Sequence, residues 1–153
     1  MKWWLTSLVV CAAFTAQAEV VELYWEDMIP KGYIAPDVQV QHEGSMAQQN
    51  LDAPVVPSLD GKVVKIPGFV VPLESDQRLT TEFLLVPYFG ACIHVPPPPP
   101  NQIVYVKFST GVPIDNLNDA VWVTGTLSTS GWQGEMATVG YALTGITVTP
   151  YDG

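Results

Sequence analysis

Five segments of the chain carry the short or alternating hydrophobic patterns that are typical of β-strands. In the third segment, for example, Ile103 and Tyr105 alternate with Val104 and Val106, which would place the two pairs on opposite faces of a sheet. Turn-forming residues separate the segments, and no helical pattern intervenes between them. The expected strands are residues 61–73, 80–89, 101–109, 120–129 and 137–151.

These strands predict a mainly β domain over residues 59–153. Pro67, Pro72 and Pro87 lie inside or at the ends of expected strands. Proline donates no hydrogen bond to a neighbouring strand, so such residues belong at sheet edges, strand ends or bulges. We therefore expect a small antiparallel, partly open barrel similar to the oligonucleotide/oligosaccharide-binding (OB) barrels. A β-sandwich is the alternative.

The pattern before this domain is different. Residues 19–33 place Val21, Trp25 and Met28 or Ile29 at helical spacing, and Pro30 would end such a helix. Residues 34–58 are polar, rich in Gln and Pro, and weakly periodic. We expect residues 19–58 to form a short N-terminal helix followed by a connector.

The first 18 residues have the pattern of an export signal. Lys2 precedes an apolar run over residues 3–14, and Ala16-Gln17-Ala18 has the small-x-small form of a cleavage site. The apolar run is short for a transmembrane span, which makes a retained membrane anchor the less favoured alternative. We expect cleavage after Ala18, which would leave a mature periplasmic protein without a membrane span.

The charge balance excludes one class of partner. The chain has 153 residues, of which 48% are hydrophobic, so it can bury a core as one domain. Removal of residues 1–18 would take away Lys2 and no acidic residue, changing the net charge from −9 to −10. Because such a surface repels phosphate backbones, we expect no nucleic-acid partner.

Cys92 and His94 are the candidate chemistry. Cys92 would be the only thiol after loss of Cys11. If the segment around it is extended, Cys92 and His94 point to the same side and can bind one metal ion, with zinc or copper suited to this ligand pair. Further ligands would have to come from His42, from the acids of the expected helix, or from Glu82 or Glu135. The alternatives are a structural role for both residues or a thiol-dependent enzyme that uses Cys92.

A run of five prolines follows this pair. Such a run adopts the polyproline II conformation, which here gives a stiff segment of about 15 Å. We expect it to act as a structural or interaction element at the surface, with Asn101 and Gln102 helping to satisfy its carbonyl groups. A ligand for an aromatic groove is the alternative, which its place in the middle of the domain disfavours. The five residues are Pro96, Pro97, Pro98, Pro99 and Pro100.

Four stretches carry a family resemblance: WEDMIP, LDGKVVKIPGFVVPL, FLLVPYFGACIHVPPPPPNQIVYV and VWVTGTL. They resemble exported bacterial proteins grouped as domain of unknown function 3299 (DUF3299), over about residues 23–151. The resemblance implies periplasmic proteins that often accompany ABC-type transport systems, some of them linked to zinc supply. It implies no reaction and no cofactor.

The leading hypothesis is a non-enzymatic periplasmic accessory or binding protein of an envelope ABC-type transport system, with zinc or another soft metal as a candidate ligand. Its partner would be a membrane permease or another periplasmic protein. A protein–protein adaptor without a ligand is the first alternative, and a thiol-dependent enzyme is the second.

Overall fold

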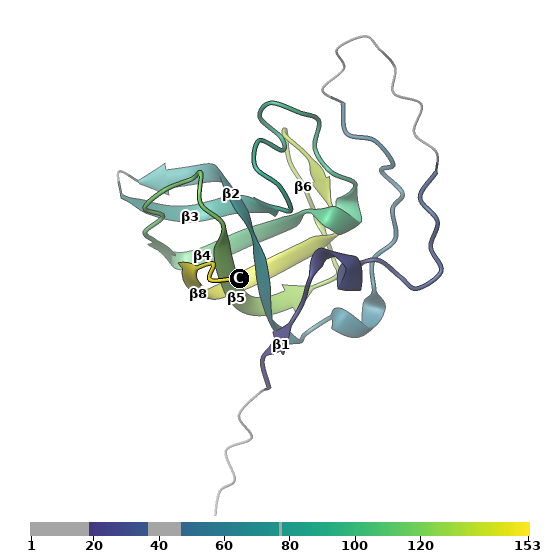
Figure 1. Ribbon diagram of the computed structural model, residues 1–153, viewed down its shortest axis with the longest axis horizontal. Helices are drawn as coiled ribbons and strands as arrows, with labels where there is room; N and C mark the ends of the chain where they lie inside the picture. Colours follow the sequence, from purple (N-terminus) through teal and green to yellow (C-terminus); the bar gives the residue numbers. More distant parts are fainter. Residues whose placement is uncertain (1–18, 37–46, 77) are drawn as a thin grey trace, which may run out of the picture.

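Five strands form a closed barrel in the computed structural model (Figure 1). The structure describes residues 19–36, 47–76 and 78–153. The expected signal peptide, residues 1–18, and His42 lie outside the described residues. Around the barrel the strand order is β2-β3-β4-β8-β5, and β5 pairs again with β2. The barrel strands are β2 (Val63–Asp76), β3 (Leu79–Val86), β4 (Val104–Val112), β5 (Val121–Ser128) and β8 (Tyr141–Pro150).

The long strand β2 closes the barrel because its two halves have different partners. Residues 63–68 pair with β5, whereas residues 69–76 pair with β3. At the changeover stands Gly68, where a Cβ atom would lie 2.7 Å from the carbonyl oxygen of Val86. No larger residue fits without a shift of backbone, so this glycine permits the close approach of β2 and β3.

The prediction of a barrel is confirmed, with two differences in detail. The barrel is closed, not partly open, and the alternative of a β-sandwich is wrong. The pairing is also not purely antiparallel, since β4 and β8 run parallel from Val104 with Tyr141 to Lys107 with Thr144. A short loop cannot join parallel neighbours, so the chain builds β5 and a hairpin between them.

The predicted N-terminal helix is wrong. The chain instead forms β1 (Val21–Glu22), which runs parallel to β2, and a single 3-10 turn, η1 (Trp25–Met28). The carboxylate of Asp27 accepts a hydrogen bond from the backbone N–H of Tyr24, and the Trp25 indole N–H donates to the carbonyl of Pro67 at 2.8 Å. A local bond and a contact with the barrel therefore hold this segment, in place of the helical hydrogen bonds that the spacing suggested.

The barrel interior holds the main core, and one end is plugged by residues from before β2. Tyr141 is fully buried there, and its hydroxyl donates to the carbonyl of Met28 and accepts from the N–H of Val56. The plug continues into the short turn η2 (Pro57–Leu59), whose Leu59 joins the core.

A second hydrophobic cluster lies on the outside of β3 and β4. Phe83 and Leu85 face the barrel interior, whereas Leu84 and Val86 belong to this outer cluster, as the alternation of a strand requires. The loop after β3 and a hairpin of β6 (Trp132–Gln133) and β7 (Thr138–Val139) cover it. Strand β3 is therefore buried on both faces, which explains its continuous apolar run.

Candidate functional site

The segment with Cys92 and His94 forms a tight turn between β3 and β4. The carbonyl oxygen of Gly90 accepts hydrogen bonds from the N–H groups of Ile93, His94 and Val95 at 3.2, 2.8 and 3.3 Å. Gly90 and Cys92 both have positive φ, of 86° and 66°. The extended conformation assumed for this segment is therefore wrong, and with it the reason to expect the two side chains on the same side.

Cys92 and His94 have different surroundings. Cys92 is half-buried and packs against the outer cluster, and this burial raises the pKa of its thiol to about 11. His94 is exposed, with its ring beside Gly90. The thiol is protonated at neutral pH, which does not suit a nucleophile.

The other proposed metal ligands that the structure describes bond to neighbouring residues or lie exposed at the surface. Glu82 accepts a hydrogen bond from Lys107 at 2.6 Å, and this bond together with one from Tyr105 lowers the pKa of its carboxyl. Glu135 is exposed on the loop between β6 and β7, and Glu22 bonds the hydroxyl of Tyr24. Across the described part of the chain, no three His, Cys, Asp or Glu residues are grouped so that they could hold a metal ion.

The same turn exposes a group of large apolar side chains. We call residues 88–95 the docking loop. Its exposed apolar side chains, with their exposed fractions, are Tyr88 (46%), Phe89 (55%), Ile93 (53%) and Val95 (41%). Single exposed apolar residues are ordinary, whereas a group of them on one short loop is a candidate contact surface.

The proline run is more buried than the surface element that we had expected. Pro97, Pro98 and Pro100 are buried, whereas Pro96 and Pro99 are only partly exposed to solvent. Pro99 has φ of −56° and ψ of 155°, which are close to the expected polyproline II values, and at Pro100 the chain enters the turn η3 (Pro100–Gln102). The extended run therefore ends at Pro99, one residue earlier than expected.

Hydrogen bonds to its carbonyl groups fasten this run to the body of the protein. Gln48 donates to the carbonyl of Pro98, and the N–H of Gly140 donates to that of Pro100, both at 2.7 Å. The carbonyl of Pro99 accepts from the backbone N–H of Gln102 at 2.8 Å, which closes η3. Because the run is held on two sides, it is not free to enter a groove on another protein.

Asn101 and Gln102 tie this segment to the N-terminal region. The Asn101 side chain donates to the carbonyl of Pro54 at 2.9 Å, and that of Gln102 donates to the carbonyl of Trp25 at 2.8 Å. Their side-chain amides thus satisfy carbonyl groups outside the proline run, where we had expected them to serve the run itself.

A family model described as "Protein of unknown function (DUF3299)" matches residues 25–150. The chain belongs to this family. The resemblance to DUF3299 is therefore confirmed. A DUF3299 family protein (PA4066) from Pseudomonas aeruginosa PAO1, known from a crystal structure, is similar to this chain with 48% identity and a TM-score of 0.77. The match covers 88% of this chain and 98% of that one.

A search of curated proteins found no match. The description of DUF3299 names no activity, so the function of this member has to be inferred from its own geometry. The residues that stand out in that geometry are the apolar neighbours of Cys92 and His94. The sequence could have pointed to these exposed residues, because aromatic and aliphatic residues without charge lie between Pro87 and Pro96.

Proposed function

We propose that this protein is a non-enzymatic adaptor of the cell envelope, which binds a protein component of a transport system through its docking loop. The observation that carries the proposal is the exposure of four large apolar side chains within eight residues. Buried aromatic and aliphatic anchors contribute most of the binding energy in many protein interfaces.

The loop is prepared for binding before a partner arrives. Three N–H groups close the turn on the carbonyl of Gly90, and the prolines that follow are held by Gln48 and Gly140. A loop that is already ordered loses little conformational entropy on binding. Rigid presentation of the anchors is therefore the role that we assign to the proline run.

The chemistry of the loop favours a protein partner with an apolar groove. Residues 87–100 contain no Asp, Glu, Lys or Arg. The chain as a whole has a net charge of −9, which repels an anionic lipid surface. We place the partner among permeases or periplasmic subunits of ABC-type systems, and the adaptor in the periplasm after loss of residues 1–18.

Two other functions have less support. OB barrels bind oligonucleotides and oligosaccharides on the face of their second and third strands. The corresponding strands here, β3 and β4, carry the outer cluster on that face, and Tyr105 is stacked against Trp132 with ring centres 4.5 Å apart. A thiol enzyme would need a lowered thiol pKa, whereas that of Cys92 is raised.

A zinc-linked form of this role rests on the ligand types of Cys92 and His94 alone. Metal analysis of protein purified without a His tag, beside a Cys92→Ser variant, tests it separately from the adaptor role. A stoichiometric metal content that the variant loses would add a metal to the proposal.

The direct test is photo-crosslinking in the intact envelope. A benzophenone amino acid at position 89 is expected to crosslink to a transport-system protein, identified by mass spectrometry, and the same group at position 146 is not. Ile146 is a matched control because it is 56% exposed on β8. Crosslinks only to lipid, or equal crosslinks from both positions, would contradict the proposal.

Substitution of apolar residues in the docking loop measures how much they contribute to binding. We expect Phe89→Ser with Ile93→Ser to weaken binding to the identified partner by about tenfold or more, as the loss of interface anchors does. Ile146→Ser should leave binding unchanged. Thermal unfolding of both variants checks that the fold is retained.

A further inference from the structure

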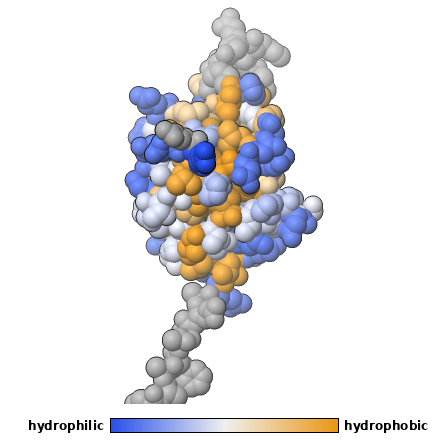
Figure 2. Space-filling model, turned by 90° about the vertical axis from the view of Figure 1, so that its left-hand side faces the viewer, coloured by the Kyte–Doolittle hydropathy of each residue, from blue (hydrophilic) through white to orange (hydrophobic). Residues whose placement is uncertain are grey.

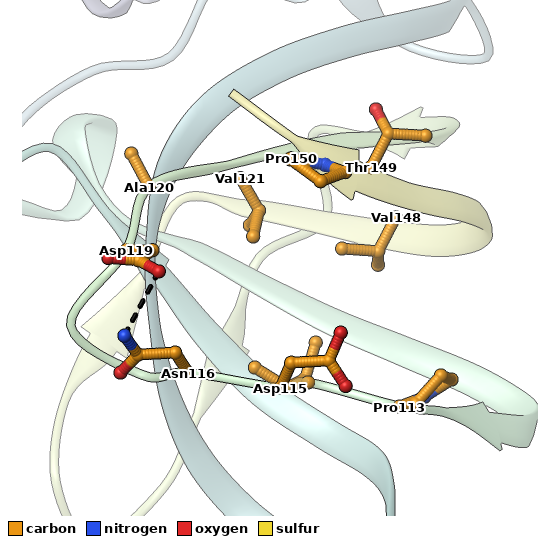
Figure 3. Close-up of a pocket in the computed structure, with 10 residues that line it drawn as sticks. Pro113, Asp115, Asn116, Asp119, Ala120, Val121, Val148, Thr149 and Pro150 are labelled. Carbon is orange, nitrogen blue, oxygen red and sulfur yellow. Dashed lines mark hydrogen bonds between the residues drawn. The ribbon is translucent and has the colours of Figure 1, made fainter. Parts of the chain in front are cut away.

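A hollow opens at the opposite end of β4 from the docking loop, between the chain that joins β4 to β5 and the end of β8 (Figure 3). Its volume is about 270 Å³. Strand β4 has nine residues, so at about 3.3 Å per residue the two sites are separated by roughly 25 Å. Neither the docking loop nor any residue of the expected metal site lines this pocket.

The walls of the pocket differ in character. Val121 of β5 and Val148 of β8 form an apolar wall together with Ile114. Asp115 and Asp119 lie on the joining chain across from these valines (Figure 3). A hollow with apolar walls and a few placed polar groups is the usual form of a small-molecule site.

One of the two carboxylates is held in place. The Asn116 side-chain amide donates to Asp119 Oδ2 at 3.0 Å (Figure 3). Asn116 Oδ1 in turn accepts a hydrogen bond from the N–H of Asn118 at 3.0 Å. Both residues are exposed, and the remaining oxygen of Asp119 and the carboxylate of Asp115 accept no hydrogen bond from another described side chain.

No basic side chain of the described residues forms an ion pair with either carboxylate. The ion pairs in the part of the chain that the structure describes are Lys65 with Glu22 and Lys107 with Glu82. Arg78 lines a neighbouring, smaller hollow that shares Ile114, but it does not line this one.

The side of the molecule that bears the turn between β2 and β3 shows hydrophobic surface framed by hydrophilic side chains (Figure 2).

We propose that this pocket binds an organic cation, an ammonium or guanidinium group on a short aliphatic chain. The carboxylates would bind the charged group, and the chain would lie against Val121 and Val148. Pockets for drug-sized ligands measure about 300–1,000 Å³, so this one suits a smaller molecule or a single side chain. The cation is either a free amine or a Lys or Arg side chain of a peptide.

The overall charge supports this ligand class. With 15 acidic and six basic residues, the chain attracts cations over distances longer than a single contact. Exposed ion pairs contribute little individually, so we expect weak binding, with Kd on the order of 1 mM for the simplest amine.

The test is a titration of the isotope-labelled protein with butylammonium chloride, followed by NMR. We expect saturable shifts at residues 113–121 and 148–150, and none with the neutral analogue butan-1-ol at equal concentration. Titration with a lysine-containing tripeptide and its norleucine counterpart tells the two sources apart. Tighter binding of the lysine peptide than of butylammonium assigns the pocket to a peptide side chain, and the reverse assigns it to a free amine.

Charge removal locates the site. Asp115→Asn, whose carboxylate has no hydrogen bond or ion pair with another described side chain, is expected to weaken butylammonium binding about threefold to fivefold. Asp119→Asn should do the same, whereas Glu135→Gln on the hairpin loop removes an equal charge without effect. Equal loss in all three variants, equal binding of butan-1-ol, or no saturable shift would overturn the proposal. None of these outcomes bears on the docking loop, which the crosslinking experiment tests on its own.

Discussion

Cys92 shows how a residue's surroundings decide its chemistry. It adopts a left-handed backbone conformation, which is uncommon for a residue with a side chain, because the turn onto Gly90 requires it. That turn directs the thiol toward the outer cluster, where burial raises its pKa to about 11. A cysteine close to a histidine in the sequence therefore becomes a packing residue beside an exposed imidazole.

We predict that the Cys92 thiol is nearly inert in the folded protein. At a pKa of about 11 only about one thiol in 10,000 is ionised at pH 7, against a few per cent for an ordinary cysteine. Reaction with a chromogenic disulfide reagent at pH 7.5 should be at least about 100-fold slower in the folded protein than in urea. A folded rate equal to the unfolded one would contradict this.

The same shift predicts a dependence of stability on pH. The unfolded thiol titrates near pH 8.5, so the contribution of the buried neutral thiol is complete below that pH. It is lost as the pH rises toward the folded pKa of about 11. Urea unfolding should therefore show a steeper loss of stability between pH 8.5 and 11 in the wild type than in Cys92→Ala.

Tyr141 connects the barrel to the plug through a single oxygen atom. Its hydroxyl bonds the carbonyl of Met28 at 2.8 Å and the N–H of Val56 at 2.7 Å. Tyr141→Phe leaves both groups without this partner, which should cost about 1–3 kcal/mol in urea unfolding. Tyr24→Phe, which loses one exposed bond to Glu22, should cost less than about 0.5 kcal/mol.

At the scale of elements, the N-terminal segment and the proline run depend on each other. Of the apolar residues in the expected helix, Met28 is fully buried, but it reaches the core from a 3-10 turn and not from a helix. Segments far apart in the sequence meet at Gln48, whose side chain bonds Pro98 and both backbone groups of Thr138 at 2.7 Å. This residue holds the proline run against β7.

We predict that Gln48→Ala lowers the free energy of unfolding by about 1–3 kcal/mol, because Pro98 and Thr138 lose their partner. The neighbouring Gln49 is exposed, and Gln49→Ala should change stability by less than about 0.5 kcal/mol. Urea unfolding of the two variants checks this. Similar values for both would show that the Gln48 bonds contribute little.

At the scale of the whole molecule, the two faces of one sheet pack against two separate hydrophobic clusters. The barrel core lies on the inner side of β3 and β4, and the outer cluster lies on the other side under the hairpin and the loop. The hairpin and the loop cover the face that OB barrels use for ligands, so the two binding sites that we propose lie elsewhere, at opposite ends of β4. The docking loop is apolar and the pocket is acidic, so the two would suit different partners.

Adjacent residues on β3 test the two cores. Leu84 faces the outer cluster and Leu85 the barrel interior, and both are fully buried. We expect Leu84→Ala and Leu85→Ala each to cost about 2–5 kcal/mol in chemical unfolding, as deletions in closed cores do. A cost below about 1 kcal/mol for Leu84→Ala would mean that the outer face is open in solution.

The sequence alone determined the strands, the barrel and the family. Alternating and continuous apolar runs are local properties, so strands such as β4 and β5 could be predicted from them. Only the tertiary structure decided that residues 19–33 would not be a helix, that the Cys92 turn would close on Gly90, and that the barrel would be closed. The missing helix and the closed barrel depend on contacts between distant residues, such as Trp25 with Pro67, which override the local preferences that a sequence pattern reveals. The Cys92 turn is local, but it depends on hydrogen bonds to the carbonyl of Gly90 that a pattern of apolar residues does not reveal.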